Sequence, residues 1–222
     1  MQEQSYYPGE IRMSLKKDGA DICESLQFVD ARTALLTVTN PSKVPFTFTA
    51  DSISTRANVS RYKNRVTIGD FYGERVIIDF SQEVKVTDTD HNYLATVPRG
   101  VEQLTIAISL VEQDTEASVQ HVHTASLLAN PSAALQANDD RWNGYLKKVI
   151  RDDMPAEYNR VAAKSIVTLL SNWRAKRGAL YHDGIVPSHA VGYFVGCWAW
   201  DCWRFSAGKV SSRTANTASL PA

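Results

Sequence analysis

The sequence has few cysteines and no long apolar run. Only Cys23, Cys197 and Cys202 occur among 222 residues, and four residues separate the last two, which is not the spacing of a redox Cys-x-x-Cys motif. Three scattered cysteines exclude a disulfide framework. No stretch approaches the roughly 18 apolar residues of a membrane helix, and the first residues do not resemble a signal peptide. We expect no membrane partner, and the cellular location stays open.

The sequence also lacks an excess of charge of either sign. The 24 lysines and arginines balance 24 aspartates and glutamates, and a surface without net charge is not typical of proteins that bind nucleic acids. No glycine-rich phosphate loop is present. His121 and His123 would lie on one face of a strand, but no acidic or cysteine side chain stands at ligand spacing from them. We therefore expect no nucleic-acid partner, no metal site and no cofactor.

The first 110 residues have the pattern of β-strands. Short segments rich in β-branched residues, such as 33–39, 75–80 and 104–108, alternate with turn sequences that contain proline, glycine and asparagine. No helical period separates these segments, which argues against a parallel βαβ sheet and favours an antiparallel β-sandwich. We predict a β-sandwich-like N-terminal domain over residues 1–123.

After about residue 124 the apolar residues recur at spacings of three and four, which is typical of helices. One helix is predicted to begin at Pro131. A second is predicted to begin near Pro155 and to stop at Gly178. Residues 209–222 are dominated by serine, threonine and alanine, and we predict that they form a disordered tail.

An aromatic cluster with one carboxylate is the best candidate for chemistry. Trp198, Trp200 and Trp203 lie within six positions, and Asp201 lies among them. Indole rings can stack on the C–H faces of a sugar, and an apolar surrounding raises the pKa of a carboxyl group, as a general acid requires. The same residues are compatible with helix packing, with Asp201 as a cap. From these residues alone, both interpretations stay open.

The segment around this cluster resembles glycoside hydrolase family 63. The resemblance rests on residues 178–188, Gly-Ala-Leu-Tyr-His-Asp-Gly-Ile-Val-Pro-Ser, and on residues 198–203, Trp-Ala-Trp-Asp-Cys-Trp. It is strongest to the bacterial α-glucosidases and mannosylglycerate hydrolases of that family. The resemblance implies an N-terminal β-sandwich followed by an (α/α)6 toroid. It also implies an oligosaccharide substrate and inverting hydrolysis of α-glucosidic or related linkages, in enzymes that are often periplasmic or secreted.

The resemblance assigns roles to individual residues. Asp201 would be the general acid that protonates the leaving glycosidic oxygen. The residues that would bind substrate are Trp198, Trp200, Trp203, Phe194, Tyr193 and Asp183. In the family a second carboxylate, in a later part of the toroid, activates the attacking water. Residues 209–222 lack the amphipathic period that would continue the toroid. We therefore expect residues 124–208 to begin an incomplete toroid, in an N-terminal fragment that is inactive alone.

Two other functions are compatible with the sequence. One is a non-catalytic β-sandwich module that binds carbohydrate or protein, with the helices as a linker. The other is an enzyme of a different toroid family, such as a trehalase-like hydrolase. The sequence leaves the sugar, the linkage, the base carboxylate and the oligomeric state open.

Overall fold

The computed structural model divides the chain into two compact units, residues 1–139 and residues 140–222. Strands β1 to β11 all belong to the first unit, whereas helix α3 and two short strands belong to the second. The residues that the structure describes are 2–17, 19–49, 58–71, 74–88, 92–111, 114–174, 176, 181–188, 192, 196 and 197.

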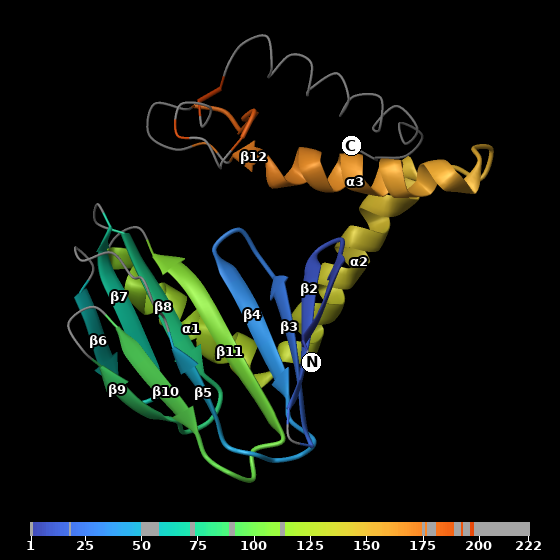
Figure 1. Cartoon of the computed structure of the whole chain (residues 1–222). Coiled ribbons are helices and arrows are strands. Elements are labelled where there is room, and N and C mark those ends of the chain that lie inside the picture. Colours follow the sequence, from blue (N-terminus) through green and yellow to red (C-terminus); the bar gives the residue numbers. More distant parts are fainter. Residues whose placement is uncertain are drawn as a thin grey trace. The chain divides into compact units, whose positions relative to one another are not determined.

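An eight-stranded sheet forms one layer of the first unit (Figure 1). Its strands, in spatial order, are β1 (Gln2–Tyr7), β2 (Glu10–Lys17), β3 (Ala20–Phe28), β4 (Thr33–Thr39), β11 (Gln103–Val111), β8 (Glu74–Phe80), β7 (Arg65–Phe71) and β6 (Asn58–Tyr62). Every neighbouring pair is antiparallel. Most of these strands follow one another through short connections, which is the arrangement that antiparallel pairing permits.

A three-stranded antiparallel sheet packs against one face of the large sheet. Its strands are β5 (Phe46–Thr49), β10 (Tyr93–Val97) and β9 (Lys85–Asp88), in the order β5-β10-β9. Alternate side chains of both sheets point into one apolar core. The large sheet supplies Val38, Val66, Ile68, Ile78, Phe80, Leu104 and Ile106, and the small sheet supplies Val86, Tyr93, Ala95 and Val97. The first unit is therefore an antiparallel β-sandwich.

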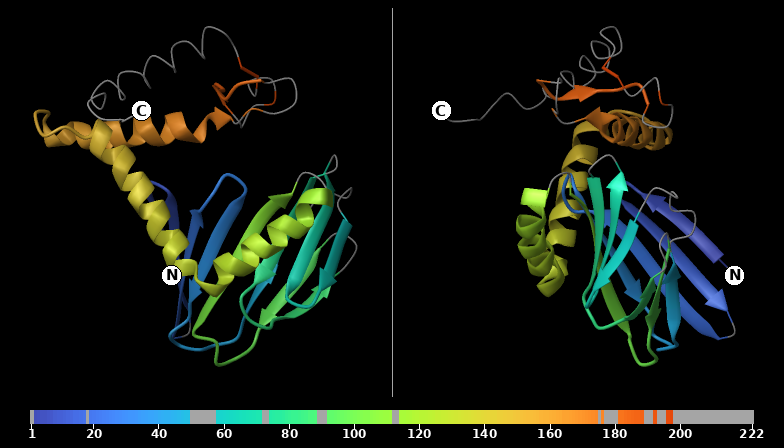
Figure 2. Two further views of the ribbon diagram at one scale, coloured as in Figure 1. Left: turned by 180° about the vertical axis from the view of Figure 1, so that it is seen from behind. Right: turned by 90° about the vertical axis from the view of Figure 1, so that its left-hand side faces the viewer.

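Helix α1 (Asp114–Ala129) covers the opposite face of the large sheet (Figure 2). His121 and His123 were expected on one face of a strand, and this is wrong because both lie on this helix. The physical reason is that polar side chains, rather than apolar ones, face the sheet at Gln120 and Thr124, in the part of α1 whose side chains are described. Val119 and Val122 are 70% exposed, whereas polar Thr124 is buried.

Polar contacts attach α1 to the sheet. The Gln120 side-chain amide donates hydrogen bonds to Thr33 Oγ1 at 3.0 Å and to Ser109 Oγ at 3.1 Å. At the next turn, His123 Nε2 lies 2.8 Å from Asp30 Oδ2. A hydrophobic periodicity search detects helices by their apolar face, so these contacts leave no signal in it.

Helix α2 (Pro131–Val149) begins at the predicted proline. Within the first unit, Asn138 is buried and its amide donates to Gln27 Oε1 at 2.8 Å and to the Gly9 carbonyl at 3.2 Å. The adjacent carboxylate of Glu10 accepts hydrogen bonds from Arg12 Nε at 2.7 Å and Ser25 Oγ at 2.6 Å. The first part of α2 is thus held to β3 and to the turn before β2 by the buried Asn138 amide.

The second unit contains a 3₁₀ turn (Ala156–Tyr158) and helix α3 (Asn159–Ser171), whose buried face includes Ile166 and Val167. The helix was expected to continue to Gly178, but it ends at Ser171. The chain then forms the short strand β12 (Trp173–Arg174), which pairs antiparallel with β13 (Gly184–Ile185). The extended conformation that this pairing requires is incompatible with another helical turn.

The predicted domain boundaries after residues 123 and 208 are not tested by these observations and stay predictions. The predicted tail, residues 209–222, lies outside the described residues. Across the part of the chain that is described, no helix combines the length and apolar character needed to cross a bilayer.

The buried carboxylate of Glu10 predicts a loss of stability in acid. Burial alone would raise the pKa of Glu10, but hydrogen bonds from Arg12, Ser25 and Gln27, with the Arg12 charge, hold it below its ordinary value of 4.5. A pKa lowered by folding stabilises the protein above the unfolded-state pKa, and this contribution is lost as the pH falls through the folded-state pKa.

Urea unfolding at pH 7, 5, 4 and 3 measures this contribution. We expect the free energy of unfolding of the wild type to fall below pH 4.5, and Glu10→Gln to show a smaller fall over the same range. Parallel pH profiles for the two proteins would contradict the role of Glu10.

Candidate functional site

Of the residues predicted to form the site, Asp183 lies in the described part of the chain. The others, Asp201, Trp198, Trp200, Trp203, Phe194 and Tyr193, lie outside the described residues. Their roles therefore stay predictions. Within the motif segment, residues 178–203, the structure describes residues 181–188, 192, 196 and 197.

Asp183 organises the loop that precedes β13. Its Oδ1 accepts a hydrogen bond from the backbone N–H of Lys176 at 2.9 Å. The next residues pair with β12, Arg174 opposite Gly184 and Trp173 opposite Ile185. One oxygen of Asp183 is thus used in a hydrogen bond to the backbone.

Gly184 is in close contact with the residue that immediately precedes the tryptophan cluster. A Cβ atom at position 184 would lie 2.5 Å from Cys197 Sγ, and the Cys197 thiol also donates to the Ile185 carbonyl at 3.7 Å. The Asp-Gly half of the family-like motif is therefore packed against Cys197, the neighbour of Trp198. A side chain at position 184 would have to displace that thiol.

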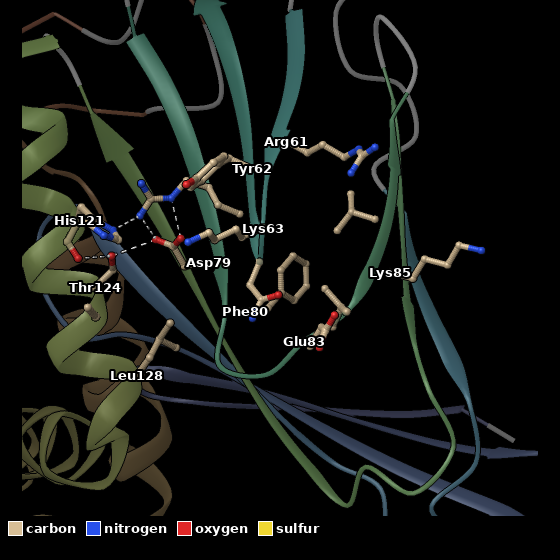
Figure 3. A pocket seen from close by; sticks show the side chains of 15 residues that line it. Arg61, Tyr62, Lys63, Asp79, Phe80, Glu83, Lys85, His121, Thr124 and Leu128 are labelled. Atoms are coloured by element: carbon tan, nitrogen blue, oxygen red, sulfur yellow. Dashed lines mark hydrogen bonds and ion pairs between the residues drawn. The ribbon is translucent and has the colours of Figure 1, made fainter.

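A cavity of about 990 Å³ opens in the first unit, where the sequence analysis expected no site (Figure 3). It lies between the β6–β7 hairpin, the segment after β8 and helix α1. Its lining residues are Arg61, Tyr62, Lys63, Asn64, Arg65, Asp79, Phe80, Glu83, Val84, Lys85, Val86, His121, Thr124, Ala125 and Leu128. The signal available in the sequence was the run Arg-Tyr-Lys-Asn-Arg at 61–65, with three cations in five residues.

A buried carboxylate is at the base of this cavity. Asp79 accepts from Arg65 Nε at 2.7 Å and from Arg65 Nη2 at 2.9 Å, and Thr124 Oγ1 on α1 donates to Asp79 Oδ2 at 3.0 Å. Arg65 Nη2 also donates to His121 Nδ1. Because Nδ1 accepts this bond, the imidazole carries its proton on Nε2 in this arrangement.

The described residues contain no group of three or more histidine, cysteine, aspartate or glutamate side chains placed to hold a metal ion. His123 faces Asp30, and His121 faces Arg65. The two histidines, which the sequence analysis considered together, thus have separate partners.

No family model matches the sequence. Among solved structures, the family GH92 inverting mannosidase of Bacteroides thetaiotaomicron matches 82% of this chain with a TM-score of 0.59 and 18% identity. The chain covers 30% of the length of that structure. Heparinase III and a heparan sulfate lyase of Pedobacter heparinus match 52% and 50% of the chain with 10% and 9% identity. They cover 22% of each structure, and their TM-scores of 0.39 and 0.37 are too low to support an argument.

The likeness to the mannosidase structure concerns the fold. The chain has a glycoside hydrolase-like fold, and the predicted class, an antiparallel β-sandwich followed by the first helices of a toroid, is confirmed. At 18% identity the likeness does not extend to substrate or catalytic residues. It also does not establish the resemblance to family 63, whose motif residues 198–203 are outside the described part.

The hydrogen bonds that Arg65 and Thr124 donate to Asp79 predict the effect of a substitution on stability. Thr124→Val preserves the shape of the side chain but removes the donor to a buried carboxylate, and we expect a loss of about 1–3 kcal/mol in the free energy of unfolding. Thr47→Val, on the exposed side of β5, is the matched control and should change stability by less than about 0.5 kcal/mol. Equal effects in urea unfolding would show that the Thr124 hydroxyl does not stabilise Asp79.

The contact at Gly184 generates a second prediction. Gly184→Ala should destabilise the second unit by about 1–3 kcal/mol, because the new methyl group overlaps Cys197 Sγ. Gly144→Ala, in α2, meets no atom within 4 Å and should be stabilising by about 0.5–1 kcal/mol. Thermal denaturation monitored by tryptophan fluorescence compares the two. A Gly184→Ala protein as stable as the wild type would contradict the close packing of Cys197.

Proposed function

We propose that this chain supplies the β-sandwich and the beginning of the catalytic toroid of an inverting glycoside hydrolase. The observation that supports this proposal is the combination of a glycoside hydrolase-like fold with a motif of the family 63 type directly after α3. The motif follows α3 in the sequence, and catalytic side chains are commonly carried by segments that a rigid scaffold positions.

Asp201 is the proposed general acid. Three tryptophans beside a carboxylate provide an apolar surrounding, which favours the protonated form of the acid near neutral pH. The protonated carboxyl donates its proton to the glycosidic oxygen as the bond to the anomeric carbon breaks. The tryptophan rings and Asp183 hold the sugar, the rings through its C–H faces and Asp183 through a hydroxyl group.

Inverting hydrolysis needs a second carboxylate on the opposite face of the sugar. In inverting enzymes the two carboxyl groups are roughly 6.5–9.5 Å apart, which leaves room for the water that the base activates. Because the chain covers 30% of the mannosidase structure, we propose that the base belongs to a part of the complete enzyme outside these 222 residues.

The motif resemblance favours an α-glucosidic linkage, whereas the solved structure with the similar fold is an inverting mannosidase. Both belong to the same reaction class, so we propose inversion at an α-linked hexose and assign glucose as the first sugar to test.

The alternative, a non-catalytic β-sandwich module that binds carbohydrate or protein, is supported by the large cavity in the first unit.

The test is a comparison of Asp201→Asn with Asp152→Asn, a substitution in the exposed turn before α3. In the complete enzyme we expect Asp201→Asn to lower kcat on unactivated α-linked disaccharides by about 10²–10⁴-fold, because general acid catalysis is lost. Aryl glycosides with good leaving groups need less protonation and should lose less. Asp152→Asn should retain wild-type rates on both.

The outcomes separate the candidate functions. An equal loss on both substrate classes would reject Asp201 as the general acid. Wild-type rates in Asp201→Asn would reject the assignment of the motif. Absence of hydrolysis of α-glucosides and α-mannosides by the complete wild-type enzyme, together with saturable binding of either sugar, would favour the binding module.

A further inference from the structure

We propose that the cavity of the first unit binds a saccharide that carries carboxylate or sulfate groups. The charged residues of the cavity favour an anionic ligand. That this ligand is a saccharide rests on the proposed function. Every lining residue belongs to the first unit, and none of them is among the residues proposed for the catalytic site. Its volume of about 990 Å³ is at the upper end of the range of roughly 300–1,000 Å³ typical of ligand sites.

The charges at the cavity favour an anion. Arg61, Lys63 and Arg65 of the β6–β7 hairpin are part of the lining. Asp79 neutralises Arg65 through the two hydrogen bonds described above. Lys63, by contrast, forms no ion pair with any carboxylate of the described residues, and Glu83 is the second acidic residue of the lining beside Asp79. The charge that an anion would meet at the hairpin is therefore that of the Lys63 ammonium.

Lys63 occupies a backbone position that does not favour lysine. Its φ is 51°, in the left-handed region, where a side chain costs energy and glycine is preferred. Tyr62 pairs with Arg65, so Lys63 and Asn64 form the two-residue loop of the hairpin. Such loops usually carry glycine at positive φ. A Lys63→Gly substitution can therefore remove the ammonium group without adding backbone strain.

The neighbouring groups suit a sugar. The Tyr62 ring is 68% exposed, and Lys63 Nζ lies 5.3 Å from its centroid. An exposed ring beside a cation can contact the C–H face of a pyranose while the ammonium pairs with its carboxylate or sulfate. His121 adds a donor, because its Nδ1 is engaged by Arg65 and its Nε2–H has no acceptor among the described side chains.

The experiment is isothermal titration of the full chain with three probes: trigalacturonate, a neutral trisaccharide of the same linkage and sodium sulfate. Trigalacturonate should bind at low salt and more weakly at 0.5 M NaCl, because the attraction between exposed charges is screened. The neutral trisaccharide and sulfate should each bind at least about tenfold more weakly, since each lacks one of the two kinds of contact.

Two lysine variants form a matched pair. Lys63→Gly removes the ammonium and suits the positive φ, so it should weaken trigalacturonate binding about tenfold without lowering the melting temperature. Lys85 is also at the cavity rim, but its side chain points away from the other lining side chains (Figure 3). Lys85→Gln should therefore leave the affinity unchanged.

In NMR spectra, trigalacturonate should shift the His121 imidazole signals and not those of His123, which lies outside the lining.

Equal affinities for sulfate, the neutral sugar and trigalacturonate would overturn the proposal, as would equal losses in the two lysine variants or unmoved His121 signals. The outcome is independent of catalysis, because the hydrolysis test uses neutral disaccharides and Asp201. Failure of trigalacturonate binding with intact Asp201-dependent hydrolysis rejects the cavity site alone. Binding here with no hydrolysis rejects the proposed enzyme alone.

Discussion

The carboxylate of Asp79 imposes the constraint on which the first unit depends. It projects from the large sheet on the side opposite the apolar core, and it is buried. An ionised carboxylate taken out of water costs several kcal/mol unless it is paired and hydrogen-bonded. Its cross-strand neighbour Arg65 supplies two donors and Thr124 of α1 supplies the third. Satisfying one charge therefore fixes a helix against the sheet and forms the base of the cavity.

The two faces of the large sheet differ in how well the sequence predicts what packs against them. The core face consists of alternating apolar residues such as Val66, Ile78 and Ile106, and this alternation made the sandwich predictable. The other face attaches helices through Asp79, Gln27 and Ser109. Polar pairs of this kind have no period that a single sequence reveals. The helical pattern was therefore recognised only after about residue 124, although α1 begins at Asp114. The end of α3 was missed because β12 is defined by a partner ten residues away.

The motif around Asp201 and the cavity of the first unit also differ in how well the sequence predicts them. The tryptophan and aspartate motif is contiguous, so it was found from the sequence, and the part that is described places Gly184 against Cys197, directly before it. The cavity combines a hairpin at residues 58–71 with a helix that begins at residue 114. Arg65 and His121 are 56 positions apart. The sequence could reveal the cluster of cations at 61–65 but not the cavity beside it, because the contact depends on the docking of a polar helix.

The proposal that the complete enzyme is an inverting hydrolase, with Asp201 protonating the leaving group, predicts the configuration of the sugar at the moment of release. The most direct measurement is proton NMR of the reaction of an α-linked glucobiose in the first minutes, before mutarotation mixes the anomers. An inverting enzyme must release β-glucose from the cleaved unit, because water attacks the face opposite to the departing oxygen. Accumulation of the β-anomer first is the result expected. First release of α-glucose would mean a retaining mechanism with a covalent intermediate and would contradict the proposed inverting hydrolysis.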